Sequence, residues 1–440
     1  MKETIVALDL GTSKSVALAA QKDHSGRISL LNTESIESPE AMRRGRIYNS
    51  DKTIDIISKL VRKMNLNLPS PIDEMYVGIG GQSLRTRLFS VKKAVEGGSI
   101  SPSLLDSLRE EANRYEPELK ENLGVVSVEY YADGQLVQEP KGTMASVIEA
   151  RFQIIEGDYF LKQSLKTVFS KKDVDVADYF ISPLATAEVS LTTDEKKSGC
   201  ALVEIGDGIT YVSIYKNGSL KCLVTLPLGG LAITKDIRCL NVSEEEAEVL
   251  KIKYGSAVLE STDNEVVTVN DDPKSLRKVE LKELNGIVEA RINEIVKNIW
   301  NQIQVSGYSQ TIDAGIVITG GSALLKNLPA FIRNQTGIEV RLANPKVWKN
   351  GVETQISPAN SCVLGLVSLG KENCLKEKII VEKIIPQPAT KPTPISTVST
   401  DQVPRNQVGT KIGKKIKTIL YNGLDIFKDE DFEDNINDKK

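Results

Sequence analysis

Histidine is nearly missing from this 440-residue chain, which contains only His24, in the turn-like stretch QKDHSGR. A mechanism built on a histidine base is not favoured, because neighbouring Asp and Gly are typical of a solvated turn. The five cysteines are scattered, odd in number and never spaced as CxxC. They fit the buried thiols of a cytoplasmic protein better than disulfides or zinc ligands.

Long apolar runs and a strong net charge are missing too. No stretch approaches the roughly 20 apolar residues that span a bilayer, and the N-terminus lacks the apolar core of a secretory signal. A formal net charge of -3 predicts no nucleic acid partner, which would need concentrated Lys and Arg. GxGxxG and GxxxxGKS/T are both absent, so a Rossmann dehydrogenase and a P-loop NTPase lose support. The length alone predicts two or more lobes.

Two glycine loops, ALDLGTSKS at 7–15 and LVEIGDGIT at 202–210, have nearly the same shape. Each follows an apolar strand that ends in an acid, and aligning Asp9 with Glu204 places Gly11 on Gly206. Glycine lets a backbone approach a phosphate, and consecutive N–H groups form an anion-binding concavity. Two facing hairpins would grip a phosphate chain, and the two acids could hold the waters of Mg²⁺. For either loop alone, a plain hairpin with glycine at a position of positive φ is an equally good interpretation.

A third glycine element, VITGGSALLKNLP at 317–329, lies between a predicted strand and a predicted helix, where glycines leave room for a base or ribose. The spacing of apolar residues predicts a helix over 50–65, beginning at an N-cap-like Ser50 or Asp51, and a long amphipathic helix over 281–303. Residues 84–163 have a different sequence pattern from the segments on either side, which predicts a helix and strands around an Asp-Gly turn. We expect them to form a small inserted α+β subdomain.

The C-terminal part of the chain has two unusual segments. Residues 385–409 hold five prolines among Thr, Ser and Gln, a composition that predicts an extended linker. Residues 411–428, KIGKKIKTILYNGLDIFK, place apolar side chains on one helical face and lysines on the rest, which is typical of a helix in an anionic membrane interface. The predicted membrane-binding residues are Lys411, Ile412, Lys414, Lys415, Ile416, Ile419, Leu420, Leu424 and Phe427. A helix that docks back on the protein is the alternative.

The three glycine elements and the segment SCVLGLVSLG at 361–370 resemble the actin-like ATPase superfamily, which also includes Hsp70 and sugar kinases. Within it, the resemblance is closest to the FtsA family of bacterial cell-division proteins, on MRRGRIYN, YVGIGGQSLRT, LPLGGLAITKDI and EEAEVLKIKYGSA. It runs in order from residue 3 to about 373. The resemblance implies an α/β, actin-like (ribonuclease H-like) duplicated two-lobe ATPase fold, with a subdomain of the 1C type inserted.

The resemblance also implies where ATP and Mg²⁺ would bind. The terminal phosphates would meet Gly11, Thr12 and Ser13 on one side and Gly206 and Gly208 on the other, and Asp9 and Glu204 would hold Mg²⁺ through water. Glu248 and Lys251 would meet the ribose, and Gly320, Gly321 and Ser322 the adenosine. An exposed helix ion pair is the alternative for Glu248 and Lys251.

The second loop departs from the family pattern Asp-x-Gly-Gly-Gly. It has the longer acid Glu204, and Asp207 replaces the middle glycine. A carboxylate that faces a triphosphate is repulsive unless a cation intervenes or the side chain turns away. We therefore expect nucleotide binding with weak or absent hydrolysis.

The subdomain boundaries follow from the resemblance and the composition. Subdomain 1A would comprise 1–83, 164–196 and the return helix 351–373, with 1C at 84–163; subdomain 2A would comprise 197–233 and 313–350, with 2B at 234–312; the linker would be 374–409, the membrane helix 410–428 and an acidic tail 429–440.

As a member of this family the chain would lie on the inner face of the cytoplasmic membrane at the division site. Subdomain 2B would receive the C-terminal tail of FtsZ, with Arg291 as a candidate contact, although a solvated helix arginine is as good an interpretation. The chain would also polymerise through 1C and recruit later division proteins. A sugar-type kinase, an Hsp70-like chaperone and an MreB-type filament are alternatives on the same fold. A kinase would need a sugar pocket and a catalytic carboxylate, for which no segment is a candidate, and it has no use for a basic tail. Residues 371–440 could not form the substrate-binding domain of the chaperone, and an MreB-type filament leaves 84–163 and the long linker unexplained.

Overall fold

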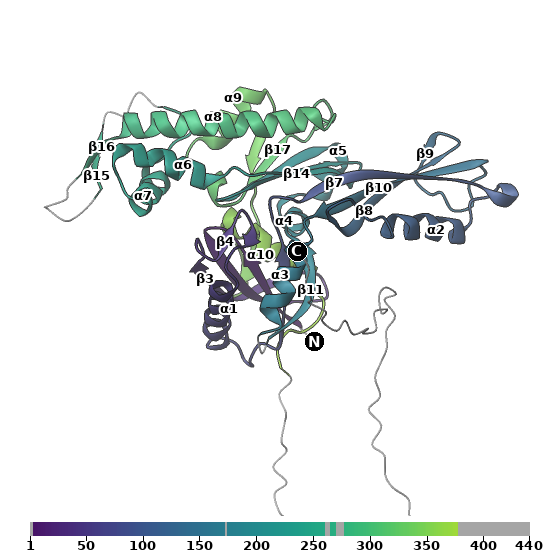
Figure 1. Ribbon diagram of the computed structural model, residues 1–440, viewed down its shortest axis with the longest axis horizontal. Helices are drawn as coiled ribbons and strands as arrows, with labels where there is room; N and C mark the ends of the chain where they lie inside the picture. Colours follow the sequence, from purple (N-terminus) through teal and green to yellow (C-terminus); the bar gives the residue numbers. More distant parts are fainter. Residues whose placement is uncertain (1–2, 172–173, 260–264, 270–276, 377–440) are drawn as a thin grey trace, which may run out of the picture. The chain divides into compact units, whose positions relative to one another are not determined.

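Two β-sheets with the same strand order organise the described residues, which are 3–171, 174–259, 265–269 and 277–376 of this computed structural model (Figure 1). The first sheet begins with β1 (Glu3–Leu10), β2 (Lys14–Lys22) and β3 (Ile28–Glu37), which pair as an antiparallel meander. β6 (Glu74–Ile79) then pairs parallel with β1, and β11 (Asp175–Ile181) pairs parallel with β6.

The second sheet repeats this pattern. β12 (Cys200–Ile205), β13 (Thr210–Lys216) and β14 (Ser219–Leu226) form the meander, and the parallel strands are β17 (Ile316–Thr319) and β18 (Val340–Leu342). The order is therefore third, second, first, fourth, fifth in both sheets. The hairpin β19 (Lys346–Lys349) and β20 (Val352–Gln355) extends the first sheet beyond β3. The predicted duplication is confirmed.

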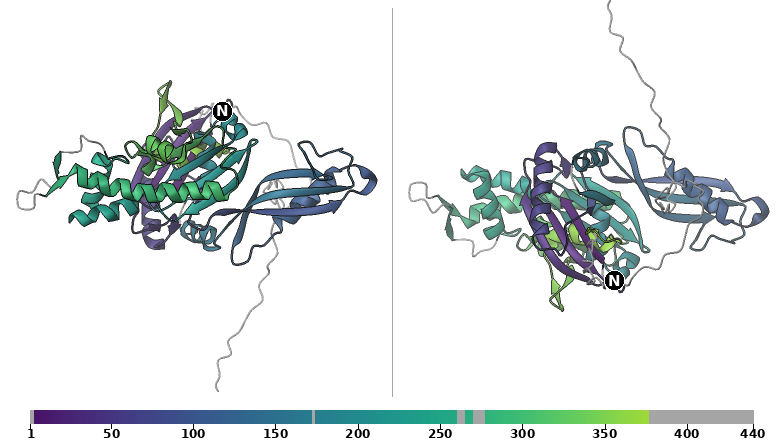
Figure 2. Two further views of the ribbon diagram at one scale, coloured as in Figure 1. Left: turned by 90° about the horizontal axis from the view of Figure 1, so that it is seen from above. Right: turned by 90° about the horizontal axis from the view of Figure 1, so that it is seen from below.

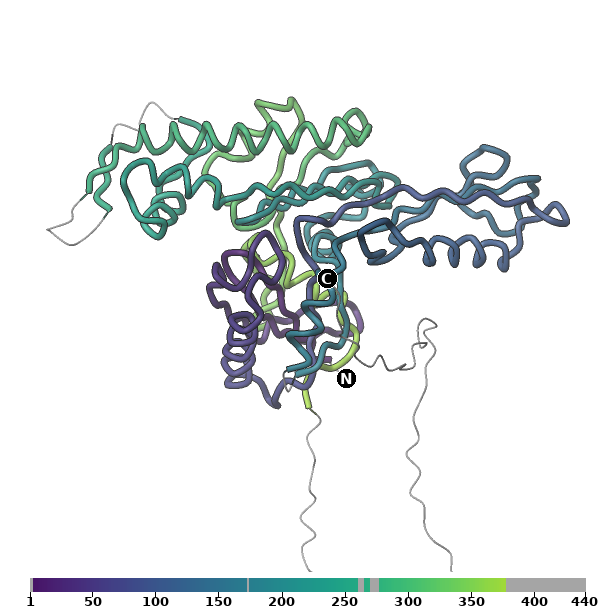
Figure 3. Tube along the Cα trace, in the orientation of Figure 1, coloured from purple at the N-terminus to yellow at the C-terminus, as the bar shows by residue number. Residues whose placement is uncertain are grey.

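Two helices, α4 (Ser182–Ser190) and α10 (Ser361–Leu369), lie between the sheets, as Figure 3 traces. They touch at Gly365, where a Cβ would lie 1.9 Å from the carbonyl oxygen of Ala185, so only glycine allows this approach. The outer face of the first sheet carries α1 (Ser50–Asn65), with α3 (Phe160–Phe169) beside it. The outer face of the second carries α8 (Leu281–Val305), which crosses it in the view from above (Figure 2).

The two longest predicted helices are present with small changes at their ends. In α8 the apolar positions predicted by period are buried, among them Val288, Ile292 and Ile299. In α1 the N-cap is Asn49, whose side chain accepts a hydrogen bond from the N–H of Lys52 at 3.0 Å. The predicted cap at Ser50 or Asp51 was wrong, because Asn49 has the extended backbone that directs its side chain to the first turn.

The inserted subdomain spans residues 85–157 and has its own core (Figure 1). Its sheet has the order β7 (Arg85–Ala94), β10 (Val147–Gly157), β8 (Glu121–Ala132) and β9 (Gln135–Val137), and α2 (Pro102–Asn113) packs against it. Phe152 and Leu108 are fully buried between them. The predicted Asp133-Gly134 turn is confirmed, since both residues have positive φ, which suits a tight hairpin.

The remaining elements lie around the second sheet and in the loops. They are β4 (Met42–Arg43), β5 (Arg46–Ile47), α5 (Thr193–Ser198), α6 (Gly230–Ile237), α7 (Glu244–Tyr254), β15 (Val266–Thr268), β16 (Lys278–Glu280), α9 (Leu328–Thr336), and the short 3-10 helices Glu96–Gly98, Arg238–Leu240, Gly321–Leu324 and Pro358–Asn360. None of the described helices is long and apolar enough to cross a membrane.

The last described residues form a short strap, residues 373–376, on the first sheet. The N–H of Cys374 donates to the carbonyl oxygen of Thr4 at 2.8 Å, and the N–H of Lys376 donates to that of Pro71 at 2.9 Å. Cys374 is fully buried. Residues 374–376, which the sequence places in the linker, are thus packed. The predicted segments 410–428 and 429–440 lie outside the described residues.

Candidate functional site

A cavity of about 430 Å³ opens where the two glycine loops face each other. It is lined by residues from both sheets, from α7 and from the third glycine element. All twelve residues that were predicted to bind nucleotide or metal line it: Asp9, Gly11, Thr12, Ser13, Glu204, Gly206, Gly208, Glu248, Lys251, Gly320, Gly321 and Ser322. The structure thus brings together residues that are up to 313 positions apart in the sequence.

The glycines of the first two loops are needed for close approach. Gly11, Gly206 and Gly208 are not among the glycines with positive φ. A Cβ on Gly11 would lie 2.5 Å from the carbonyl oxygen of Lys14, and one on Gly208 would lie 2.8 Å from Oγ1 of Thr12. The loops therefore touch across the cavity. The interpretation as plain hairpins with positive-φ glycines is wrong, because these side-chain positions are filled by neighbouring atoms.

Two half-buried carboxylates, Asp9 and Glu204, line the cavity at the ends of β1 and β12. Burial raises the pKa of Asp9, although a hydrogen bond with Cys362 and the charge of Lys14 lower it in part. Burial, followed by the charge of Asp9, raises the pKa of Glu204 to about 8. Oε2 of Glu204 has no hydrogen-bond partner among the described residues. A buried acceptor without a donor is costly, which marks it as a place for a cation or its water.

The ion pair of Glu248 and Lys251 on α7 is not the exposed pair that was the alternative, since Lys251 is buried. Nζ of Lys251 donates to Oε2 of Glu248 at 2.7 Å, to Oγ1 of Thr234 at 2.9 Å and to the carbonyl oxygen of Gly230 at 3.2 Å. An ammonium has three donors. Because all three are used, Lys251 acts by holding Glu248 against α6.

Asp207 lies on the side of the cavity next to α7. Burial raises the pKa of its carboxyl, and the strongest charge acting on it is that of Lys251, which lowers the pKa. Glu248 raises it further. The charges that act on this carboxylate are therefore those of side chains on α6 and α7.

Several cavity residues were missed by reading the sequence. Ile252 and Leu324 line the cavity as exposed apolar side chains, 72% and 51% accessible, and could hold a flat ring. An apolar residue directly after Lys251, on the polar side of a helix, was the available signal for Ile252. Gly45, in the hairpin of β4 and β5, also lines the cavity, and its N–H donates to Oγ1 of Thr12 at 3.1 Å.

Arg291, the predicted partner contact, does not line this cavity. It lies on α8, where its Nε and Nη2 bond the two carboxylate oxygens of Asp236 at 2.5 and 3.0 Å, and it also pairs with Glu294. The hydrogen bond from Arg291 to Asp236, together with the charges of Asp236 and Glu294, raises the pKa of Arg291. Its side chain is 27% exposed. Arg291 is therefore a paired arginine at the junction of α6 and α8. A partner that bound its guanidinium would have to compete with Asp236 and Glu294 or bind beside them.

Comparison with known sequences assigns the family. The sequence model of the family described as cell division protein FtsA matches residues 201–365. The cell division protein FtsA of Porphyromonas gingivalis is 33% identical over 363 residues, which cover 81% of this chain and 76% of that protein. The chain belongs to the FtsA family.

Two further FtsA proteins and one solved structure extend this assignment. The FtsA proteins of Neisseria meningitidis and Bacillus subtilis are 29% and 27% identical and match 82% and 78% of this chain, and 89% and 79% of their own lengths. A chain of the PilM-PilN type IV pilus biogenesis complex superposes with a TM-score of 0.59 at 14% identity, over 82% of this chain and 97% of that one. The predicted FtsA family and actin-like fold are confirmed, and the sugar-type kinase is not favoured.

Proposed function

We propose that this FtsA-family protein binds ATP with Mg²⁺ between its two lobes and, as a polymer, links the FtsZ ring to the inner face of the cytoplasmic membrane. The observation that carries the nucleotide site is the contact of Gly208 with Thr12 in a cavity that is also lined by the carboxylates of Asp9 and Glu204. Two loops that touch through glycine present backbone N–H groups from both lobes to one phosphate chain.

Each part of ATP has a place in the cavity. The β- and γ-phosphates lie between Gly11, Thr12 and Ser13 on one side and Gly206 and Gly208 on the other. Glu248, held by Lys251, accepts hydrogen bonds from the ribose hydroxyls, because the donors of Lys251 are already used.

The adenine lies on the third glycine element, Gly320, Gly321 and Ser322. The apolar side chains of Ile252 and Leu324 cover its faces. Oγ of Ser322 donates to the carbonyl oxygen of Gly206 at 2.9 Å, so the adenosine and phosphate parts of the site are joined.

The residues present fit a hydrated Mg²⁺. No group of three or more His, Cys, Asp or Glu side chains among the described residues could hold a metal ion directly. Asp9 and Glu204 would hold the ion through its waters, which is usual for Mg²⁺. The ion neutralises the phosphate charge and stabilises both carboxylates in their ionised form, including the unpartnered Oε2 of Glu204.

The remaining parts of the proposal rest on the family and on the sequence. The lysine-rich segment 410–428 binds the anionic membrane as an interfacial helix at the end of the linker. Subdomain 2B, residues 234–312, receives the C-terminal tail of FtsZ, with Arg291 near the contact. Subunits contact one another through 1C, and the assembly recruits later division proteins. The protein binds ATP, but its hydrolysis of ATP is weak or absent.

The membrane part is tested by co-sedimentation with vesicles of anionic or neutral lipid. Three chains are compared: the full chain, one that ends at residue 428 and one that ends at residue 408. We expect the first two to pellet with anionic vesicles and the third to stay in solution, because only the third lacks the lysine-rich segment. Equal binding by the full chain and the chain ending at 408 would refute the tether.

The nucleotide part is tested separately by isothermal titration calorimetry of Mg·ATP into the chain ending at 408. Binding that needs both ATP and Mg²⁺ supports the site, and the matched variant Glu248→Gln should bind more weakly through the ribose. No binding of ATP by the folded protein refutes it, whatever the vesicles do.

A further inference from the structure

The inserted subdomain is connected to the first sheet by a five-residue connector, Gly80–Leu84, that passes beside the cavity. Gly80 follows β6 and lines the cavity, and Arg85 begins β7 of the inserted subdomain. The other connection is residues 158–159, between β10 and α3. The connector therefore has one end at the proposed nucleotide and the other at the base of the insertion.

At its cavity end, the connector is held by a buried hydroxyl of the second lobe. Tyr211 on β13 accepts a hydrogen bond from the N–H of Gly81 at 2.7 Å, and its side chain is buried. A Cβ on Gly80 would lie 2.8 Å from that hydroxyl oxygen, so the contact is possible only with glycine there. The contact joins β13, one strand beyond Glu204, to the path into the insertion.

The first phosphate loop holds the connector from the other side. Oγ1 of Thr12 accepts from the N–H of Gly45, and Gly45 lies so close to Gly81 that a Cβ on it would be 3.1 Å from the Gly81 backbone. The N–H of Gln82 donates to the carbonyl oxygen of Arg44 at 3.2 Å. Tyr211 of the second lobe thus bonds the connector directly at Gly81, whereas Thr12 of the first lobe reaches it through the hairpin residues Arg44 and Gly45.

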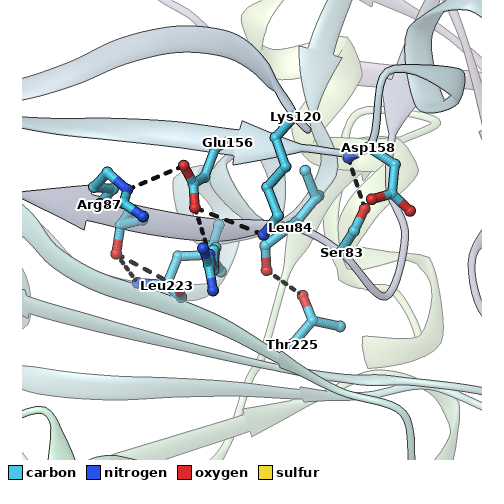
Figure 4. Close-up of polar contacts among 10 residues, drawn as sticks. Ser83, Leu84, Arg87, Lys120, Glu156, Asp158, Leu223 and Thr225 are labelled. Atoms are coloured by element: carbon cyan, nitrogen blue, oxygen red, sulfur yellow. Dashed lines mark hydrogen bonds and ion pairs between the residues drawn. The ribbon is translucent and has the colours of Figure 1, made fainter. Parts of the chain in front are cut away.

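Beyond the connector, the base of the insertion is rigid. Ser83 accepts from the N–H of Asp158 at 2.9 Å, which joins the two connections (Figure 4). The fully buried carboxylate of Glu156 bonds Arg85 at 2.5 Å and Arg87 at 3.2 Å and lies 3.6 Å from Lys120. A displacement of the connector therefore moves β7 and β10 together.

The insertion is also seated on the free edge of the second sheet. Oγ1 of Thr225 on β14 donates to the carbonyl oxygen of Leu84 at 2.8 Å, and the N–H of Leu223 donates to Oγ1 of Thr86 at 2.8 Å (Figure 4). Further along, Ser127 donates to the carbonyl oxygen of Leu220 at 2.9 Å. Side-chain hydrogen bonds of this kind contribute about 1 kcal/mol each, and the ion pair of the buried Lys221 on β14 with Glu129 on β8 adds to them.

We infer that the connector Gly80–Leu84 transmits occupancy of the cleft to the orientation of the inserted subdomain on β14, with Tyr211 as the positioning residue. This inference rests on the proposed ATP binding. A phosphate chain bound by both loops sets the position of Thr12 relative to Tyr211, and the connector is bonded to both lobes. Small shifts at a site become rigid-body movements where a packed element has two arrangements.

The test measures the distance between the insertion and the second lobe in the full chain. Spin labels are placed on Cys239, an exposed cysteine of the second lobe, and on the variant Asp106→Cys at an exposed position of α2. Pulsed electron resonance is recorded with and without Mg·ATP. We expect ATP to shift the distance in this protein, and the shift to be lost in Tyr211→Phe, which removes only the hydroxyl.

Tyr215→Phe is the matched control, because Tyr215 is a buried tyrosine on the same face of the same strand, four residues away from Tyr211. It should keep the shift. Because Tyr211 itself lines the cavity, the distance is recorded at ATP concentrations that calorimetry shows to saturate each variant. A full ATP-induced shift in Tyr211→Phe, or the same loss in Tyr215→Phe, overturns the role of Tyr211.

The two proposals fail in different ways. If ATP binds to the doubly labelled protein and the distance does not change, the coupling is refuted and the nucleotide site stands. If calorimetry detects no ATP binding to the folded protein, the proposed function is refuted and the coupling falls with it. Thr225→Val, which removes the hydrogen bond to Leu84, should change the distance without ATP, and an unchanged distance would contradict the seating on β14.

Discussion

The buried acid Glu204 makes the nucleotide-free protein less stable as the pH rises. Its pKa is raised from 4.5 to about 8 in the folded protein, first by burial and then by the charge of Asp9. Between these two values the folded state binds more protons than the unfolded state, so the free energy of unfolding falls with increasing pH. The stabilisation is fully present below about pH 4.5 and is lost at about pH 8.

The size of the effect follows from the interval between the two pKa values. At about 1.4 kcal/mol per pH unit, that interval gives an upper bound of about 5 kcal/mol. A cooperative unit of the size of Met1–Ile379, with an unfolding entropy of about 2.1 cal/mol/K per residue, converts this into about 6 °C in Tm. Glu204→Gln keeps the shape and removes the ionisation, so it should abolish this component of the pH dependence.

The assay is thermal unfolding by circular dichroism, without nucleotide or Mg²⁺, from about pH 5 to about pH 8.5. We expect the wild type and Glu204→Gln to unfold at similar temperatures at the acidic end and the variant to be more stable at the alkaline end. Glu353→Gln, at a half-exposed surface ion pair, is the control and should follow the wild type. Parallel curves for the wild type and Glu204→Gln would refute the account of a buried, proton-binding carboxylate.

Two further substitutions test the loop contact and the base of the insertion. Gly208→Ala would place a methyl group 2.8 Å from Thr12, force the loops apart and weaken ATP binding at least about tenfold in calorimetry; wild-type affinity would contradict the contact. Glu156→Gln should lower the free energy of unfolding by about 3 kcal/mol at neutral pH in urea titrations. Burial alone would raise the pKa of Glu156, but the hydrogen bond from Arg85 and nearby cations lower it, so this loss should shrink as the pH falls below about 4.5, and a constant loss would argue against the ion cluster.

The meander of each sheet could be predicted from the sequence because its strands pair with their neighbours in the chain. β1 with β2, and β12 with β13, are joined by the short glycine loops that the motifs identify. The fourth strand of the second sheet, β17, pairs with β12 across more than 100 residues. No local sequence pattern predicts that β17 pairs with β12, and this pairing could be expected only from the family resemblance.

The sequence predicted those site residues that lie in glycine and acid motifs. It did not predict the residues whose role depends on contacts between distant segments. The role of Lys251 depends on Thr234 and Gly230, which reach it from another helix. Gly45 is brought to Thr12 by the hairpin of β4 and β5. These strands have two residues each, which is too short for a pattern of alternating apolar residues to reveal them. In the sequence, Tyr211 is indistinguishable from the other apolar residues of its strand. Its hydroxyl contacts Gly81 only in the folded protein, where the two lobes pack together.

The strap at residues 373–376 determines where a mechanical load would enter the protein. Any force applied to the chain beyond Lys376 is borne first by a few backbone hydrogen bonds, those of Lys376 with Pro71 and of Cys374 with Thr4 and Asp73. These bonds lie at the start of β1 and β6, the strands whose other ends reach the cleft at Asp9 and Gly80. A pull on the chain beyond Lys376 would therefore strain the same sheet that holds the first glycine loop, with the strap as the first part to yield.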